Sequence, residues 1–165
     1  MFEIERKYLI EYPDIKKIKE NHEVTEVKIT QDYLTKGLGG KNRRVRCWES
    51  SGVKHYIYTE KKKITNLRRI ENEDEITEEE YLELLKEKDP ACRTIKKTRY
   101  RVPYGGLLYE IDVFDEVKGS ALMEAEIEDE SVSIPIPPFV TVIREVTEEP
   151  GFTNHSIAKN GYQRF

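Results

Sequence analysis

Most segments of this chain alternate between charged and apolar residues with a period of two. This period is typical of β-strands, whose successive side chains point to opposite faces of a sheet. Eight segments follow it: residues 2–10, 24–35, 42–49, 55–63, 69–76, 93–102, 107–114 and 122–128. Gly-containing runs at 37–40, 51–52 and 104–106 separate neighbouring segments, as hairpins require. The chain is therefore expected to consist mainly of antiparallel strands.

Two helical segments interrupt the strands at matching places. Residues 13–21 follow the first strand, and residues 77–88 follow the fifth, where Thr77 and Glu80 form a capping box. The order strand, helix, three strands thus occurs twice, which indicates a duplicated unit with weak sequence identity between the halves. Short helices are also expected over 138–143 and 153–159 of the tail. Because no linker divides the halves, residues 1–165 are expected to form one domain.

The charged faces of the strands carry like charges in runs. Arg44 and Arg46 share one face, as do Lys97 and Arg99, and Glu124 shares one with Glu126. A sheet with one solvated face accounts for any single strand. Like charges two residues apart repel, however, so the recurrent runs are stable only when counter-charges or ligands neutralise them. We therefore favour a closed barrel of about eight strands with these side chains inside.

The net charge of −4 conceals a division along the chain. Residues 1–69 carry 17 Lys and Arg against 10 Asp and Glu, whereas residues 70–165 carry 11 against 22. Arg binds phosphate oxygens bidentately and Lys binds them as a point charge, while Mg²⁺ and Mn²⁺ prefer carboxylate oxygens. A barrel built from both halves is therefore expected to hold a polyanion together with its metal ions.

Several other functions lack the residues they need. His22, His55 and His155 are scattered, and Cys47 and Cys92 lack metal-ligand spacing, which disfavours zinc. No basic stripe with interleaved aromatic residues favours nucleic-acid binding, and no apolar run approaches the roughly 18 residues that span a membrane. With no signal peptide visible, a cytoplasmic location is expected. A homodimer is compatible with the sequence, which does not fix the oligomeric state.

The motifs resemble the CYTH proteins, also called triphosphate tunnel metalloenzymes. Glu3-Ile4-Glu5-Arg6-Lys7 resembles the N-terminal ExExK signature of that family. Eight further matches follow in the family's order, at residues 31–34, 44–46, 59–61, 69–73, 97–100, 109–112 and 125–128, and at 145–147 with Asn154 and Ala158. Because they span essentially the whole chain, the resemblance implies an α+β fold, an eight-stranded antiparallel β-barrel with flanking helices.

The resemblance also implies roles for individual residues. The implied metal ligands are Glu3, Glu5, Glu126 and Glu128. A slip of two residues in the last strand would instead make Glu124 and Glu126 its ligands. The implied phosphate contacts are Lys7, Arg44, Arg46, Lys61, Lys97 and Arg99, with Arg144 near one tunnel end. Lys7 and Tyr33 are the implied catalytic pair, and Glu71 and Glu73 are candidates to bind metal or orient water.

Three acids and the large aromatic residues have simpler interpretations. Glu75, Glu110 and Asp112 are equally well explained as ion-pair partners across the barrel. Trp48 and most of the ten tyrosines are expected in the core or at the rim.

The implied activity is hydrolysis of inorganic triphosphate or a related linear triphosphate with Mg²⁺ or Mn²⁺. Class IV adenylyl cyclases of the family tend to carry an aromatic-Gly segment before ExExK, whereas only Met1 and Phe2 precede Glu3 here. Hydrolysis is therefore preferred. Two alternatives stay open, a cyclase that converts ATP to cyclic AMP and a non-catalytic module that binds polyphosphate or nucleotides.

Overall fold

The computed structural model describes residues 2–35, 42–65 and 67–165, without the side chains of residues 2, 3, 63 and 69. The strands are β1 (Phe2–Glu11), β2 (Thr25–Tyr33), β3 (Asn42–Ser50), β4 (Val53–Lys63), β5 (Arg68–Ile76), β6 (Ile95–Tyr104), β7 (Leu107–Phe114), β8 (Ser120–Glu126) and β9 (Val142–Glu145). The helices are α1 (Ile15–Asn21), α2 (Glu78–Leu84) and α3 (Asn154–Asn160), with 3₁₀ turns at Leu85–Glu87 and Pro150–Phe152. None of the helices in these ranges is long and apolar enough to cross a membrane.

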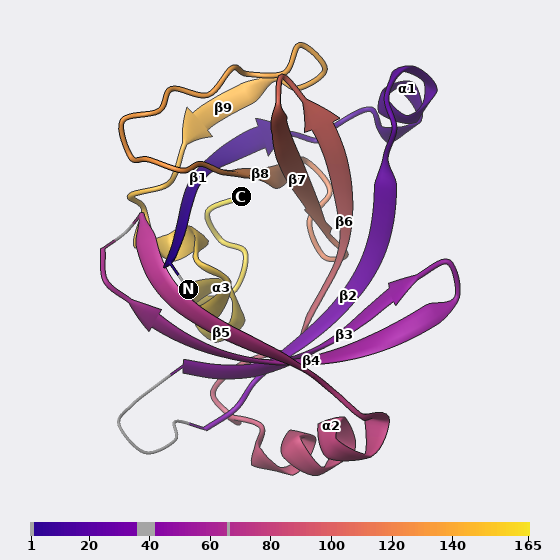
Figure 1. Cartoon of the computed structure of the whole chain (residues 1–165), viewed down its shortest axis with the longest axis vertical. Helices are drawn as coiled ribbons and strands as arrows, with labels where there is room; N and C mark the ends of the chain where they lie inside the picture. The colour runs from indigo at the N-terminus through magenta and orange to yellow at the C-terminus, as the bar shows by residue number, and fades with distance from the viewer. Residues whose placement is uncertain (1, 36–41, 66) are drawn as a thin grey trace.

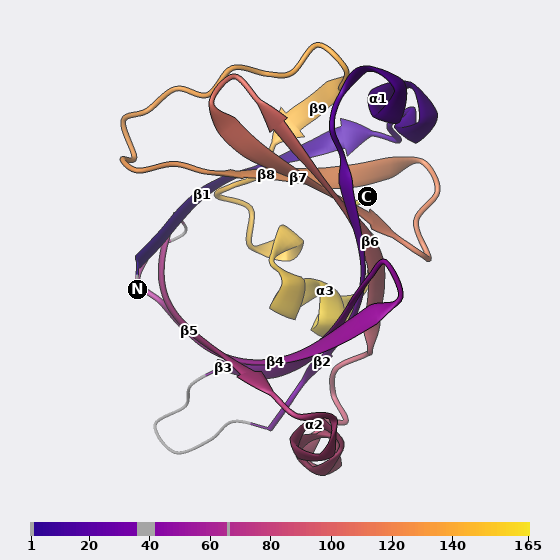
Figure 2. The ribbon, with the colours of Figure 1, turned by 45° about the vertical axis from the view of Figure 1, so that its right-hand side comes forward.

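All the strands belong to one antiparallel sheet that curls into a tunnel (Figures 1 and 2). Their order is β5-β4-β3-β2-β6-β7-β8-β1-β9, and a short pairing of residues 2–4 of β1 with β5 joins one end strand of this order to the strand beside the other end. β1 and β5 each precede a helix and three strands, and β2 and β6 meet in the middle of the order. This arrangement confirms the expected antiparallel tunnel and the repeated order of elements.

Two hairpins turn within the Gly-containing runs expected at 51–52 and 104–106. Ser51 and Gly52 join β3 to β4 with φ of 51° and 77°, and Gly105 and Gly106 join β6 to β7 with φ of 59° and 80°. Positive φ at both central residues gives the twist that a tight hairpin needs. The turn expected at residues 37–40 lies outside the described residues.

The tunnel wall is charged on its inner face and apolar on much of its outer face, which reverses the usual arrangement of a small barrel. Glu5 and Lys7 line the interior, so the strand alternation places Tyr8 and Ile10 on the outside. That outer side of β1, β6, β7 and β8 is buried in an apolar cluster that includes Ile18 of α1. A second outer cluster joins the β3–β4–β5 wall to α2. Two external cores therefore support a wall whose inner face is free to carry charge.

One end of the interior is apolar and is filled by the C-terminal segment. Leu9, Ile95, Phe114 and Leu122 form a cluster there with Phe152, Ile157 and Ala158. Figure 2 shows α3 within the ring of strands. The helix expected over 153–159 is present, and it acts as a plug at this end of the tunnel.

The prediction of a helix over 138–143 was wrong. A turn follows Pro137, whose carbonyl oxygen accepts from the amide of Val140, and β9 then pairs with β1 through Val142 and Arg144. The segment contains Thr, Val and Ile in succession, and β-branched residues favour strands over helices. Part of the edge of β1 beyond its pairing with β5 provides the partner for this ninth strand.

Candidate functional site

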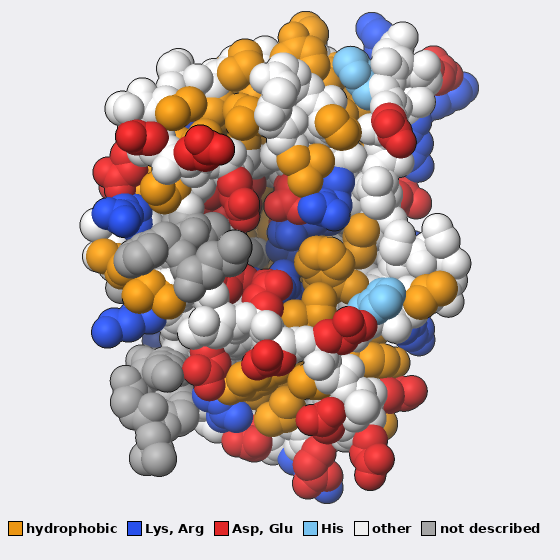
Figure 3. All heavy atoms as spheres, viewed as in Figure 1, with side chains coloured by type: hydrophobic (Ala, Val, Ile, Leu, Met, Phe, Trp, Pro, Cys, Tyr) orange, Lys and Arg blue, Asp and Glu red, His pale blue; other side chains and the backbone are white. Residues whose placement is uncertain are grey.

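The tunnel encloses a cavity of about 950 Å³ with charged walls. In Figure 3 the face of the molecule is hollowed at this place, with Lys and Arg side chains inside and acidic side chains around it. The basic residues that line the cavity are Lys7, Arg44, Arg46, Lys61, Arg99 and Arg101. The acidic residues that line it are Glu5, Glu71, Glu73, Asp74, Glu110, Glu124 and Glu126. Every strand from β1 to β8 contributes at least one lining residue.

Carboxylates gather where β1 pairs with β8. Glu5 lies opposite Glu126 and Lys7 lies opposite Glu124 in this pairing. The Lys7 Nζ atom is 3.4 Å from Glu124 Oε1, and it also donates to the carbonyl oxygen of Phe152 at 3.0 Å. Burial by itself raises the pKa of Glu124, but the charges of Lys7 and Arg99 hold that pKa well below its usual range. This acidic corner therefore contains a carboxylate that stays ionised although it is buried.

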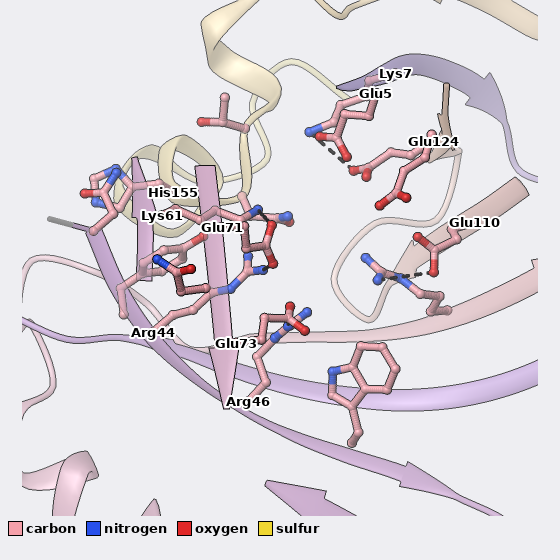
Figure 4. A pocket seen from close by; sticks show the side chains of 18 of the residues that line it. Glu5, Lys7, Arg44, Arg46, Lys61, Glu71, Glu73, Glu110, Glu124 and His155 are labelled. Carbon is pink, nitrogen blue, oxygen red and sulfur yellow. Dashed lines mark hydrogen bonds and ion pairs between the residues drawn. The ribbon is translucent and has the colours of Figure 1, made fainter. Parts of the chain in front are cut away.

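The opposite wall carries three cations, each held by an acid of β5. The Arg46 Nη2 atom donates to Glu73 Oε1 at 2.6 Å, and the Arg44 Nη2 atom is 3.5 Å from Glu71 Oε1. The Lys61 Nζ atom is 3.4 Å from the second Glu71 oxygen. Figure 4 shows this group across the cavity from Glu5, Lys7 and Glu124.

This basic wall is under electrostatic strain. Burial and the neighbouring charge of Arg44 together lower the pKa of Arg46 to about 10, although the charge of Glu73 opposes this shift. Burial likewise raises the pKa of Glu73, helped by a hydrogen bond with Glu71. Because the cations are buried beside each other, an anion entering the cavity would be strongly attracted to them.

A third group of charges lies on β6 and β7. Arg99 donates to Asp112 through Nε at 2.8 Å and through Nη2 at 3.0 Å, a bidentate geometry. The Lys97 Nζ atom is 2.8 Å from the same carboxylate and donates to Asn154 Oδ1 at 3.2 Å. Burial lowers the pKa of Lys97 to about 8. Lys97 is buried between Asp112 and the plug and is not among the residues that line the cavity.

Two of the three remaining acids form ion pairs with Arg or Lys, although between the neighbouring strands β6 and β7 rather than across the barrel. Asp112 pairs with Arg99 and Lys97, and Glu110 pairs with Arg101 at 3.1 Å. Glu75 pairs instead with His55, at the exposed end of β5.

Tyr33 lines the cavity beside the plug. Its hydroxyl accepts a hydrogen bond from Gln31 Nε2 at 3.2 Å, and its ring lies edge-on to His155, with centroids 4.9 Å apart. The ring is therefore held between β2 and α3.

Besides Lys97, the structure places two predicted residues away from the cavity lining. Glu128 is exposed beyond the end of β8, whereas both Glu124 and Glu126 line the cavity. Arg144 is exposed on β9, where it makes two hydrogen bonds to Glu149. The side chain of Glu3 lies outside the described atoms. Of the two registers considered for the last strand, the one with Glu124 and Glu126 brings both carboxylates to the cavity.

The sequence interpretation missed some lining residues. Trp48 shares the face of Arg44 and Arg46 in the strand alternation, so its place was available from spacing alone. Asn154 and His155 gave no such signal, because their place depends on insertion of the tail into the tunnel. No group of three or more His, Cys, Asp or Glu side chains that could hold a metal ion is assembled among the described residues.

Comparison with known proteins places this fold in context. A model of the CYTH domain matches residues 1–162. A curated inorganic triphosphatase of Acetivibrio thermocellus is 35% identical over 129 residues, which cover 76% of each chain.

Solved structures agree with that comparison. The crystal structure of an inorganic triphosphatase is 29% identical, with a TM-score of 0.59, and the match covers 95% of this chain and 94% of that one. The PH1819 protein from Pyrococcus horikoshii has the same TM-score of 0.59 at 19% identity, covering 78% of this chain and 80% of that one. At that identity the second match supports the fold alone.

Proposed function

The chain belongs to the CYTH family, and we propose that it hydrolyses inorganic triphosphate, or a related linear triphosphate, with the help of a divalent cation. The observation that carries this proposal is a cavity with buried arginines on two walls and carboxylates at the β1–β8 corner. The similarity to inorganic triphosphatases at 35% and 29% identity supports the same reaction.

The proposed substrate contacts are charged donors on two walls. Arg44, Arg46 and Lys61 on one side and Arg99 on the other can each donate to phosphate oxygens, and Arg presents two donors in one plane. Lys97 would act indirectly, because its ion pair with Asp112 keeps that carboxylate charged and in the position that holds Arg99. A linear chain of phosphoryl groups suits such an extended set of cations.

The acidic corner supplies the type of donor that a hard divalent cation needs, although its carboxylates among the described residues are not drawn together as a metal site. Glu5, Glu124 and Glu126 offer carboxylate oxygens, the ligands that Mg²⁺ and Mn²⁺ prefer, and Glu124 is ionised at neutral pH. We propose these three as the ligands, with Glu3 a further candidate and with Glu71 and Glu73 able to orient a water molecule. A bound Mg²⁺ or Mn²⁺ would supply neutralisation of the charge on the phosphoryl oxygens.

The residues of the chain can then assist an in-line hydrolysis. A water oxygen attacks the terminal phosphorus, and the bond from that phosphorus to the bridging oxygen breaks. The products are orthophosphate and pyrophosphate, and a proton from the water is released to solvent. Arg46 and Arg99 would stabilise charge on the equatorial oxygens. Lys7, with an ammonium group fixed by Glu124, would neutralise charge on the leaving group, and Tyr33 stays its proposed partner in catalysis.

A cytoplasmic location and a homodimer remain predictions.

A substrate panel tests this function. Tripolyphosphate, ATP and thiamine triphosphate would each be incubated with Mg²⁺ or Mn²⁺, and phosphate release and cyclic AMP would be measured. We expect phosphate release to be fastest from tripolyphosphate. Cyclic AMP from ATP with tripolyphosphate untouched would establish a cyclase instead.

The same panel separates an enzyme from a binding module. Glu5→Gln should abolish turnover while calorimetry still detects tripolyphosphate binding, because the phosphate-binding cations remain. Tight binding by the wild-type protein without turnover on any of the three compounds would establish a non-catalytic module and refute the hydrolase.

A further inference from the structure

Two arginines from different strands meet at one indole ring in the cavity. The guanidinium carbon of Arg46 on β3 lies 5.2 Å from the ring centroid of Trp48, and that of Arg99 on β6 lies 5.9 Å from it. β2 separates these strands in the sheet, with Ile29 paired to Trp48 on one side and to Lys97 on the other. Arg46 lies opposite Gln31 and Arg99 lies opposite Val27, so the two arginines lie two residues to either side of that level, on the inner face. Trp48 therefore lies between the two arginines and contacts both.

The indole counters a repulsion that the acids leave in place. Arg99 is fixed by its bidentate pair with Asp112. Arg46 donates to Glu73, whose side chain is 44% exposed, and to the hydroxyl of Thr59 at 3.3 Å. The face of an aromatic ring attracts cations, and the attraction grows when the groups are shielded from water. Trp48 thus gives Arg46 a contact that is not lost when its carboxylate partner moves.

The indole ring of Trp48 is held in position by contacts to its face and not by a hydrogen bond from its N–H group. The Trp48 Nε1 atom is buried and has no hydrogen-bond partner among the described residues. A buried donor without a partner costs stability, so a hydrogen bond does not explain the orientation of the ring. Its two cation contacts do.

We propose that Trp48 is a positioning residue that holds Arg46 and Arg99 side by side, so that the two guanidinium groups bind one phosphoryl group of the substrate. This proposal rests on the phosphate-binding role proposed above for the two arginines. Trp48 selects the substrate through these arginines rather than by stacking, because the arginines lie over its ring. Affinity for an inorganic phosphate chain should therefore depend on the aromatic face of Trp48 and not on its N–H group.

Three variants of this 165-residue chain test this role. Trp48→Leu removes the aromatic face, Trp48→Phe keeps a face without the N–H group, and Tyr56→Leu removes an aromatic ring from the outer cluster, where Tyr56 packs against Tyr81 with centroids 4.8 Å apart. Calorimetry would measure the Kd of tripolyphosphate with divalent metal chelated. Steady-state assays with Mn²⁺ would give KM and kcat, and thermal melts would report folding.

The expected results differ between the variants. Trp48→Leu should weaken tripolyphosphate binding by about tenfold or more and raise KM more than it lowers kcat, as loss of two shielded cation–π contacts predicts. Trp48→Phe should stay within about threefold of wild type. Tyr56→Leu should lower the melting temperature and leave Kd unchanged, since Tyr56 lies outside the cavity.

Two results would overturn the proposal. Binding by a folded Trp48→Leu protein within twofold of wild type would show that the arginines need no indole. Equal damage in Trp48→Phe and Trp48→Leu would assign the role to the N–H group. If wild-type protein binds tripolyphosphate without cleaving it, the hydrolase proposal fails, while the metal-free binding results still decide the role of Trp48.

Discussion

At the scale of single residues, the period of two was sufficient to predict most of the charged interior. Once one inward-facing residue of a strand is known, the period of two gives the other inward-facing positions. Arg44, Arg46 and Arg99 could therefore be assigned to the cavity without coordinates. Register along a strand is harder to predict, because a slip of two residues preserves the face. This is why Glu126 was predicted in both registers and Glu128 in only one. Trp48 was assigned to the core or rim because its residue type outweighed its spacing.

Paired substitutions on β8 and beyond it decide between the two registers. Glu124→Gln should lower kcat/KM for tripolyphosphate by at least about 100-fold, the loss expected when one preorganised group that stabilises charge is removed. Glu128→Gln should change it by less than about twofold, because the side chain of Glu128 is exposed beyond the strand. Steady-state kinetics with Mn²⁺ measures both. A large loss in Glu128→Gln with full activity in Glu124→Gln would restore the other register.

The buried ammonium of Lys97 should make stability depend on pH. Burial lowers its pKa to about 8 in the folded protein, whereas its ordinary value is 10.5. Between these values the unfolded chain binds more protons than the folded protein, so the contribution of Lys97 to the free energy of unfolding rises with pH. Urea unfolding at pH 7 and pH 10 should therefore show the stability of wild type relative to Lys97→Met increasing with pH, on the order of 1 kcal/mol per unit of pKa shift.

The neighbouring lysine provides the control for this pH effect. Lys96 is exposed on the same strand, so Lys96→Met removes a lysine of β6 that is not buried. A pH dependence as large in Lys96→Met as in Lys97→Met would remove burial as the cause.

At the scale of elements, the strands were predictable and the tail was not. Each long strand carries its own alternation, and its turns carry Gly, so local signals and tertiary structure agree. The tail has no such agreement. Its helix α3 was expected, but its insertion into the tunnel depends on Leu9, Ile95 and Phe114 being on the inner face of strands far away in sequence. β9 depends likewise on a vacant stretch of the edge of β1.

The plug should contribute strongly to stability through its apolar contacts. Ile157 of α3 is fully buried among residues from several strands, so Ile157→Ala should lower the free energy of unfolding by about 2–5 kcal/mol. Leu82 of α2 is 54% exposed, and Leu82→Ala should cost no more than about 0.5 kcal/mol. Urea unfolding of both variants measures the difference. Equal losses would mean that α3 is not part of the folding core.

At the scale of the whole molecule, the fold explains why the net charge says little about the ligand. The halves of the chain differ in sign, with 17 basic and 10 acidic residues before residue 70 and 11 and 22 after it. In the sheet order, three strands from each half lie between β5 and β1, and together these strands surround one cavity. The apolar clusters outside support this wall, while the charges inside remain strained until a ligand neutralises them.

Tripolyphosphate should therefore stabilise the whole fold even when divalent metal is chelated. At a concentration 100 times its Kd, a ligand that binds only the folded state adds about 2.7 kcal/mol to the free energy of unfolding. For a chain of this size, that raises Tm by roughly 5–10 °C. Arg46→Met should lose most of this shift, because Arg46 is buried on the basic wall. Lys19→Met should keep it, because Lys19 is exposed on α1, outside the tunnel. Thermal melts over a tripolyphosphate titration measure the shift, and an equal loss in both variants would mean that the anion binds outside the cavity.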